Sequence, residues 1–297
     1  MEKAVYIDQA GNSYTRSKFI RYFEKKVMKT ISKYNMIGKD DVVGVGLSGG
    51  KDSMTCLYII NKIQRERRRK VYAILIDEGI KGYRSSTIKD AKEFCKQHNI
   101  PLKIYKFSDV IGTTIDKVVR KENPCTTCGI FRRYVLNKAA RDLKLDKIAT
   151  GHNLDDEAQV LLMNQFKGNV SFSAKLGPVA GVLSHEKFIP RIKPLYFCTE
   201  KEVLLYTKLM RFPVKFIECP NAKNSFRNIV GDYLNQLENQ FPGTKQGIVN
   251  SFLAILPDLQ KRYKNKLIGT CSICGEPAAK NVCRHCELMR KFKLIKY

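Results

Sequence analysis

The chain reads Val42-Val43-Gly44-Val45-Gly46-Leu47-Ser48-Gly49-Gly50-Lys51-Asp52-Ser53 at the point that decides its fold. The first part alternates β-branched residues with glycine, as a buried strand does. A turn of small residues follows and opens an apolar helical run: Met54, Leu57, Tyr58, Ile60 and Ile63. A strand, a glycine turn and a helix N-terminus together predict an anion site, because unpaired backbone N–H groups and the helix dipole face the ligand.

Two common nucleotide motifs fit this stretch incompletely. Gly44-x-Gly46-x-x-Gly49 matches the dinucleotide fingerprint, but the basic run 65–70 replaces the acidic residue expected about 20 residues further on. A Walker-type loop needs Ser or Thr after its lysine, whereas Asp52 follows Lys51 here. Neither motif therefore accounts for the whole stretch.

The hexapeptide Ser48-Gly49-Gly50-Lys51-Asp52-Ser53 instead resembles the PP-loop of ATP pyrophosphatases. That resemblance implies cleavage of ATP between its α and β phosphates and an adenylated substrate. Ser48 and Ser53 offer hydroxyl donors for phosphate, and Lys51 offers a positive charge.

Composition narrows the class of protein further. The 297 residues include 54 Lys and Arg against 28 Asp and Glu, a net charge of +26, which favours a polyanionic partner. No apolar run approaches the roughly 18 to 20 residues that span a bilayer, and Met1-Glu2-Lys3-Ala4 lacks an apolar signal core. We therefore expect a cytoplasmic protein without a membrane segment. Most of the ten cysteines fall in C-x-x-C pairs, which in a reducing compartment indicate metal ligation.

Short apolar strands alternate with helices along the first half of the chain. Strands are expected at 42–47, 71–76, 102–107 and 147–151, and helices at 17–34 and 83–98. This alternation predicts an α/β fold with a parallel, doubly wound sheet. Ligands of such sheets bind at the carboxyl ends of the strands. The expected nucleotide contacts therefore lie at three strand ends: Leu47, Ser48, Gly49, Gly50, Lys51, Asp52, Ser53, Ile76, Asp77, Gly151, His152 and Asp156.

Three consecutive carboxylates follow the fourth expected strand. Asp155, Asp156 and Glu157 stand at a helix start, where acidic residues cap the helix and favour its dipole. One of them could also hold Mg²⁺ on the ATP phosphates, because Mg²⁺ prefers one or two carboxylates plus phosphate oxygens. His152 fits either a capping role or a nucleotide contact.

Cys125 and Cys128 form a C-x-x-C pair that opens a basic helix, and Cys219 follows an expected strand at 214–217. The pair alone fits a redox site, half of a zinc site or an iron–sulfur ligand set. Three thiolates without a fourth ligand favour a cluster with one open iron, provided that Cys219 folds back to the pair. Three other cysteines have apolar surroundings and are expected in the core: Cys56, Cys95 and Cys198.

The last third of the chain reads as helices followed by a metal knuckle. Helices are expected at 199–210, 224–240 and 245–263, and the last two carry apolar stripes that we interpret as core: Phe226, Ile229, Tyr233 and Leu237, then Ile248, Phe252, Ile255 and Leu259. Arg227 is a candidate ligand contact because it follows Cys219 closely.

Two C-x-x-C knuckles with a short spacer close the chain: Cys271, Cys274, Cys283 and Cys286. Four thiolates complete a tetrahedron, so this pattern predicts a structural zinc ribbon with His285 as a bystander. The ribbon either contacts RNA through its basic flanks or caps the chain end.

Taken together, these motifs resemble those of the tRNA 2-thiolation enzymes of the TtcA/TtuA type over nearly the whole chain. The resemblance implies a five-stranded parallel PP-loop domain that binds ATP and Mg²⁺, adenylates the C2 oxygen of a tRNA base and replaces that oxygen with sulfur. It implies a [4Fe-4S] cluster on Cys125, Cys128 and Cys219, whose open iron holds the incoming sulfide. Asp156 matches the catalytic aspartate, and Arg132 matches a catalytic or ATP-contacting basic residue that is usually lysine.

The resemblance also sets domain limits and partners. We expect an N-terminal helical segment at 1–40, the PP-loop domain with the cluster site at 41–220, a helical extension at 221–264 and the ribbon at 265–297. Many TtuA-type members begin with a further zinc finger, whereas no Cys or His precedes Cys56 here. The expected partners are tRNA and a sulfide source or sulfur-carrier protein, and a homodimer is left open.

Two other functions stay open at this point. One is a PP-loop enzyme that transfers nitrogen, which needs no iron. The other is a non-catalytic RNA-binding protein whose nucleotide pocket acts as a sensor.

Overall fold

A six-stranded sheet lies at the centre of the protein in a computed structural model that describes residues 3–118, 124–180, 187–215, 217, 219–222, 225–263 and 268–295. The strands lie in the order β5-β4-β3-β6-β8-β7. Their bounds are β3 Val43–Gly46, β4 Val71–Asp77, β5 Leu102–Lys106, β6 Lys147–Ala149, β7 Val179–Ala180 and β8 Arg191–Ile192. The first five strands in this order are parallel, and β7 pairs antiparallel at the edge.

The order of the strands explains where a ligand can bind. The chain runs from β3 outward to β4 and β5 and then returns to place β6 on the other side of β3. Neighbouring connections diverge at such a reversal and leave a crevice at the carboxyl ends of the strands. The turn at 47–50 follows β3, and Gly151 follows β6, so both lie at this crevice.

Helices cover both faces of the sheet. One face carries four helices: α1 Arg16–Lys33, α2 Lys51–Glu66, α3 Arg84–Gln97 and α9 Glu200–Leu209. The other carries four more: α4 Phe107–Val110, α5 Ile115–Val118, α6 Pro124–Asp142 and α12 Arg284–Lys291. Alternate side chains of one strand enter the two cores, as Ala73 and Ile74 of β4 do.

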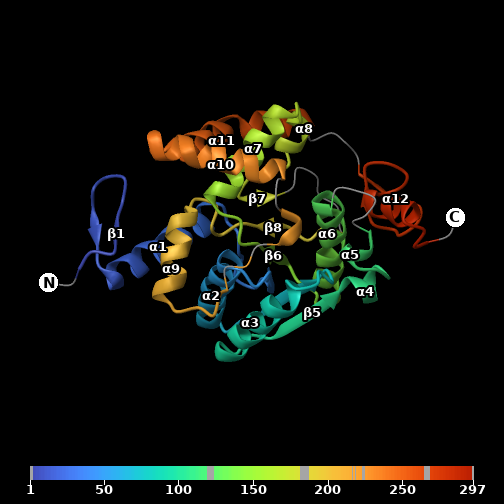
Figure 1. Ribbon diagram of the computed structural model, residues 1–297, viewed down its shortest axis with the longest axis horizontal. Coiled ribbons are helices and arrows are strands. Elements are labelled where there is room, and N and C mark those ends of the chain that lie inside the picture. Colours follow the sequence, from blue (N-terminus) through green and yellow to red (C-terminus); the bar gives the residue numbers. More distant parts are fainter. Residues whose placement is uncertain are drawn as a thin grey trace.

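A third apolar cluster lies at one end of the sheet. It joins α7 Leu154–Phe166, α8 Val170–Ser173, α10 Phe226–Gln240 and α11 Thr244–Tyr263, which lie together along the upper edge of Figure 1. Val230 and Leu234 form the buried face of α10 against this cluster. A short 3-10 helix, η2 Pro220–Ala222, precedes α10 and packs on α6.

Two small hairpins lie at opposite ends of the view in Figure 1. At one end, β1 Tyr6–Ile7 pairs with β2 Ser13–Tyr14, and Tyr6 packs on Phe19 of α1. At the other, β9 Gly269–Thr270 pairs with β10 Pro277–Ala278 beside α12. No helix in the described part of the chain is long and apolar enough to cross a bilayer.

The α/β class and the parallel sheet predicted from sequence are confirmed, and two details are wrong. Val214, Lys215 and Ile217 form no strand, and Phe216 lies outside the described residues; the fifth parallel strand is β8. Val214 instead packs on the core beneath α9. The predicted core stripe of α10 is also wrong, because Ile229 is 61% exposed while the neighbouring stripe of Val230 and Leu234 is buried.

The predicted stripe of α11 is wrong in part for the same reason. Phe252 is buried as expected, but Ile255 is 53% exposed. Val249 and Leu256 take the remaining buried positions. The three cysteines expected in the core are buried: Cys56, Cys95 and Cys198.

Candidate functional site

The turn after β3 is held by hydrogen bonds between its own serines. Ser53 Oγ lies 3.0 Å from Ser48 Oγ, accepts from Ser48 N at 3.1 Å and donates to Gly50 O at 2.9 Å. Gly50 is the N-cap of α2, so the first N–H groups of the helix point out of this turn. The turn is therefore held in one shape by its own hydrogen bonds, and we call residues 48–53 the cradle.

Two glycines allow the backbone to pack closely around this cradle. Gly49 has φ +90°, and a Cβ there would lie 2.7 Å from Thr87 O. A Cβ on Gly151 would lie 2.6 Å from the carbonyl carbon of Asp52 and 2.8 Å from Ser53 N. The end of β6 thus packs directly on the first turn of α2.

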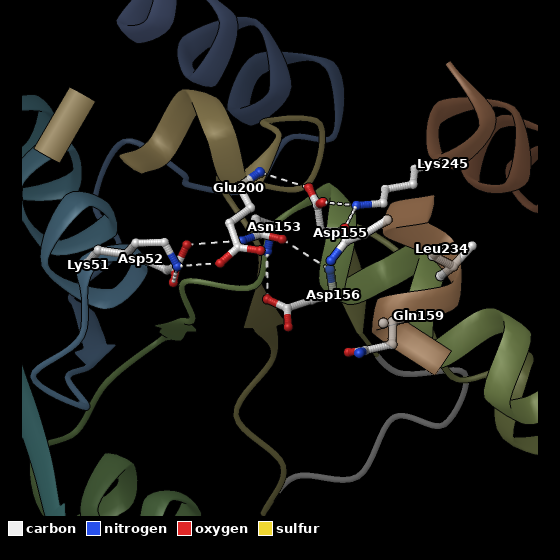
Figure 2. A pocket seen from close by; sticks show the side chains of 11 residues that line it. Lys51, Asp52, Asn153, Asp155, Asp156, Gln159, Glu200, Leu234 and Lys245 are labelled. Atoms are coloured by element: carbon white, nitrogen blue, oxygen red, sulfur yellow. Dashed lines mark hydrogen bonds and ion pairs between the residues drawn. The ribbon is translucent and has the colours of Figure 1, made fainter. Parts of the chain in front are cut away.

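A cavity of about 260 Å³ opens beside the cradle, and charged side chains line it (Figure 2). Lys51 Nζ lies 3.0 Å from Asp52 Oδ2 and 2.9 Å from Glu200 Oε1. On the other side, Lys245 pairs with Asp155, whose Oδ2 also accepts from the backbone N–H of Glu200 at 2.7 Å. Burial raises the pKa of Asp52, and the Lys51 ammonium opposes that rise.

Asp156 caps the start of α7 and also binds an arginine. Its Oδ2 accepts from Asn153 N at 3.2 Å, and Asn153 Oδ1 accepts from Asp156 N at 3.0 Å, which makes a capping box at the start of α7. Its Oδ1 accepts from Arg227 at 2.6 Å. Arg227 also donates to Gln159 Oε1 at 2.8 Å. Asp156 therefore faces the cavity with a cation already beside it.

The other two carboxylates of this run have different surroundings. Glu157 is buried and forms an ion pair with Lys193, with Nζ 2.7 Å from Oε1. Asp155 is held by Lys245 as described above. His152 is exposed, and its Nδ1 lies 2.9 Å from Thr150 Oγ1.

The chain brings Cys219 back to Cys125 and Cys128. Cys125 Sγ lies 3.4 Å from Asn221 O, just past Cys219, and η2 packs on the first turns of α6. Cys219 is close enough to raise the pKa of both other thiols, after the larger effect of lost solvation. Cys125 is exposed, whereas Cys128 is buried.

The three thiols differ in arrangement from a single-ion site. Within the described part of the chain, the four tail cysteines are the set whose ligand atoms lie within 4.8 Å of one another. Cys125, Cys128 and Cys219 do not form such a group. Three thiols are a donor set that an iron–sulfur cluster can use.

Arg132 connects Cys128 to a buried carboxylate. It donates to Cys128 Sγ at 3.3 Å, and its Nε lies 2.9 Å from Glu78 Oε1. Glu78 follows β4 and is 2% exposed; its Oε2 lies 2.5 Å from Nε of Arg84. Arg84 in turn donates to Ser48 O at 2.7 Å. An unbroken row of polar groups thus joins the cradle to the cysteine pair.

The remaining predicted contacts lie at neighbouring strand ends. Ile76 O accepts from Arg84, and Asp77 Oδ1 accepts from Gly79 N at 2.9 Å to close the turn after β4. Leu47 is buried, and its N–H donates to Ile74 O at 2.8 Å. These three residues support the cradle, while Lys51, Asp52 and Asp156 line the cavity.

The four tail cysteines form a compact group. Cys274 Sγ lies 3.6 Å from Cys283 Sγ, and Cys271 Sγ accepts from Cys283 N at 3.3 Å. Although burial raises the pKa of Cys271, backbone N–H bonds bring it down to about 6, which favours the thiolate that a metal needs. Four sulfurs at this spacing fit Zn²⁺.

His285 stands outside this group, as predicted. Its ring stacks on Tyr134 of α6, with centroids 3.6 Å apart and an interplanar angle of 3°. Arg141 of α6 binds Glu276 through two hydrogen bonds. The tail is therefore docked along the helix that begins with Cys125 and Cys128.

Sequence reasoning missed several residues of this site. Glu78 and Arg84 were not singled out, although Glu78 stands in an acidic strand end beside Asp77. Glu200 and Lys245 come from helix starts far along the chain, and only the folded structure brings them to Lys51 and Asp155. Nothing in their local sequence indicates this position.

The family model described as "PP-loop domain" matches residues 20–237. The chain belongs to the PP-loop family. It is 37% identical to the tRNA-5-methyluridine(54) 2-sulfurtransferase of Pyrococcus horikoshii over 94% of this chain and 88% of that protein. It is 35% identical to the tRNA 2-thiolation protein NcsA of Haloferax volcanii over 93% and 92% of the two chains. Within the PP-loop family it belongs with the tRNA 2-thiolation proteins.

A solved structure agrees with this placement. The U34-tRNA thiolase NcsA from Methanococcus maripaludis, with its [4Fe-4S] cluster, matches with a TM-score of 0.85 and 36% identity. The match covers 99% of this chain and 95% of that one. The sheet, the cradle and the helical layers are thus those of a PP-loop tRNA thiolation protein.

Proposed function

We propose that this chain is an ATP-dependent tRNA 2-thiolation enzyme that binds a [4Fe-4S] cluster on Cys125, Cys128 and Cys219. One observation carries the proposal: the chain just past Cys219 returns to Cys125 at the start of α6, and the row of Arg132, Glu78 and Arg84 joins this place to the cradle. A nitrogen-transferring ligase has no need for three thiols at that place.

The first half of the reaction uses the cradle. The N–H groups at the start of α2, Lys51 and the hydroxyls of Ser48 and Ser53 face the β and γ phosphates and stabilise the departing pyrophosphate. Asp52 and Asp156 are the carboxylates that would hold Mg²⁺ on these phosphates, since both line the cavity and carry oxygens toward it. The C2 oxygen of the uridine attacks the α phosphorus, and the bond to pyrophosphate breaks.

The second half uses the thiols. When bound, the cluster supplies an open iron that presents inorganic sulfide to the activated base. Sulfide then forms the new bond to C2, and the C2–O bond breaks to release AMP, with no net oxidation or reduction. Arg132 donates to Cys128 Sγ and belongs to the row that leads to the cradle, so its guanidinium can also face the negative charge on the departing AMP.

The substrate has to bring one base out of its stack to reach this site. The net charge of +26 supplies attraction for the phosphate backbone of tRNA. In this proposal a sulfur-carrier protein or free sulfide would supply the sulfur, and the tail cysteines would hold Zn²⁺ as a structural ion. The protein acts in the cytoplasm, as the names of several relatives state for those proteins.

Anaerobic reconstitution tests the proposal. The protein is loaded with iron and sulfide and incubated with ATP, Mg²⁺, sulfide and unmodified tRNA, and the nucleosides are separated by mass spectrometry. We expect 2-thiouridine together with AMP and pyrophosphate in equal amounts, and no product from Cys219→Ser. Cys95→Ala, which changes a buried cysteine of the core, is the matched control and should keep activity. A protein that takes up no iron on reconstitution, or a fully loaded protein that releases AMP but forms no 2-thiouridine, would contradict the proposal and favour a nitrogen-transferring ligase.

A further inference from the structure

We infer that Glu78 is a positioning residue that fixes Arg132 against Cys128 and ties this contact to the ATP cradle through Arg84. The inference rests on the proposed function, in which Cys128 is a cluster ligand. It assigns a role to a side chain that touches neither the nucleotide cradle nor the cysteines directly.

The first step of the argument is burial. Glu78 is 2% exposed and the Arg84 side chain 6% exposed, so neither charge is solvated by water. A buried charge is retained only when partners satisfy it. Glu78 forms ion pairs with two such partners, with Oε2 2.5 Å from Nε of Arg84 and Oε1 2.9 Å from Nε of Arg132, although the contact between Oε2 and Arg84 Nε does not have the geometry of a hydrogen bond. A carboxylate at this place is therefore the group that holds two guanidinium ions together.

The second step is the shape of the guanidinium. Arg132 uses Nε for Glu78 and a terminal nitrogen for Cys128 Sγ at 3.3 Å. Because the group is planar, fixing Nε also fixes the direction of the other donors. Half of the Arg132 side chain is otherwise exposed, so Glu78 is what keeps it from swinging into solvent. A lysine at this position would present its three N–H donors from a single nitrogen, so it could not span the two groups as the planar guanidinium does.

The third step is the link to ATP. Arg84 repeats the arrangement on the other side, with Nε toward Glu78 and terminal nitrogens donating to Ser48 O at 2.7 Å and to Ile76 O. Ser48 begins the cradle, so Arg84 fixes the position of Glu78 relative to the cradle. Two guanidinium ions against one carboxylate leave a net positive charge beside Cys128, which favours the thiolate that a cluster needs there. The geometry thus aligns the cradle with the sulfur site through one shared carboxylate.

A double-mutant comparison separates this role from a general structural one. Glu78→Gln and Arg132→Gln should each lower kcat for thiolation by about 10- to 100-fold, the effect of one charge-assisted hydrogen bond, with little change in the KM for ATP. If Glu78 acts through Arg132, the double variant loses no more than either single one. Independent effects that multiply would overturn the inference.

The reduction potential of the bound cluster gives a readout that does not depend on activity. Loss of an N–H donor to a ligand sulfur lowers the potential. We expect Arg132→Gln to lower the potential. Glu78→Gln removes a negative charge, which by itself raises the potential, and releases Arg132 from Cys128, which lowers it; its shift should therefore be more negative in the presence of Arg132 than in the Arg132→Gln background. The same shift in both backgrounds would contradict the role.

Two further variants complete the design. Glu202→Gln is the matched control, because Glu202 is equally buried, at 1% exposed, and its Oε2 lies 2.8 Å from Lys26 Nζ, outside the row of Arg132, Glu78 and Arg84. Its effect on kcat should multiply with that of Arg132→Gln, and the potential should stay unchanged. Glu78→Asp keeps the negative charge and replaces Glu78→Gln if that variant fails to fold. Because its shorter side chain reaches Arg132 less well, we expect an activity between those of wild type and Glu78→Gln. Wild-type activity in Glu78→Asp would overturn the inference. If wild-type protein forms no 2-thiouridine, the proposed function fails, while the potentials still decide the role of Glu78.

Discussion

Replacing Gly151 by alanine isolates the contact between the end of β6 and the ATP cradle. The new methyl carbon would lie 2.6 Å from the carbonyl carbon of Asp52, 2.7 Å from its oxygen and 2.8 Å from Ser53 N. All three are backbone atoms in the first turn of α2, so no side chain can rotate away to make room.

The size of the effect follows from these distances. Ordinary contacts of a Cβ begin at 3.4 Å, so the turn has to move by about 0.6 to 0.8 Å. Forcing a methyl group into a packed site costs roughly 1–3 kcal/mol. Because the displaced atoms are those that cradle phosphate, we expect ATP affinity to fall by about 5- to 100-fold, and the free energy of unfolding to fall by a similar cost.

Urea denaturation and equilibrium titration with ATP measure the two quantities separately. Gly247→Ala is the matched control, because Gly247 lies inside α11 and a Cβ there meets nothing within 4 Å. Alanine in a helix interior is about 0.5–1 kcal/mol better than glycine, so this variant should gain stability and keep its ATP affinity.

The reasoning would be refuted by a Gly151→Ala protein that binds ATP as tightly as the wild type. Loss of stability in both variants would also contradict it, since the two substitutions add the same methyl group to opposite surroundings.

Three other predictions concern charge and metal. Lys193→Met should lower the free energy of unfolding by about 3–5 kcal/mol, because it leaves Glu157 buried without its partner. Burial already raises the pKa of Glu157 above its ordinary 4.5, so the native state of this variant holds the proton more tightly than the unfolded chain does. The loss of stability relative to wild type should therefore be smallest below pH 4.5 and grow as the pH rises, which urea unfolding at several pH values measures. Cys274→Ser should lower both the zinc content, from about one ion per chain, and the melting temperature, measured by elemental analysis and calorimetry. Binding of tRNA should weaken steeply between 50 and 200 mM salt, by about 10³-fold if six or more phosphates are contacted, and a flat response would count against a tRNA substrate.

Local sequence predicted those parts of the protein that depend on neighbouring residues. The turn of residues 48–53, the cysteine knuckles of the tail and the strands β3, β4, β5 and β6 each have their signal within a few positions. The α/β fold followed from the alternation of strands and helices. These predictions hold because backbone geometry and ligand spacing are local properties.

The parts that sequence could not predict are long-range. Helix α10 has two adjacent apolar stripes, and only its contact with α7 and α11 decides that Val230 is buried and Ile229 exposed. The two-residue strand β8 is too short to show a period. Glu78 looks like any acid at a strand end until the fold places two arginines beside it.

Helix α6 connects the tail to the cysteine pair, because the tail packs on the same helix that carries Cys125 and Cys128. The helix has 19 residues and so is about 28 Å long; it begins at the cysteine pair and runs under the docked ribbon, where Tyr134 and Arg141 hold it. Oxidation or metal loss at the four tail sulfurs would weaken these contacts with the second half of the helix, and we expect that loss to loosen the helix that carries Cys125 and Cys128.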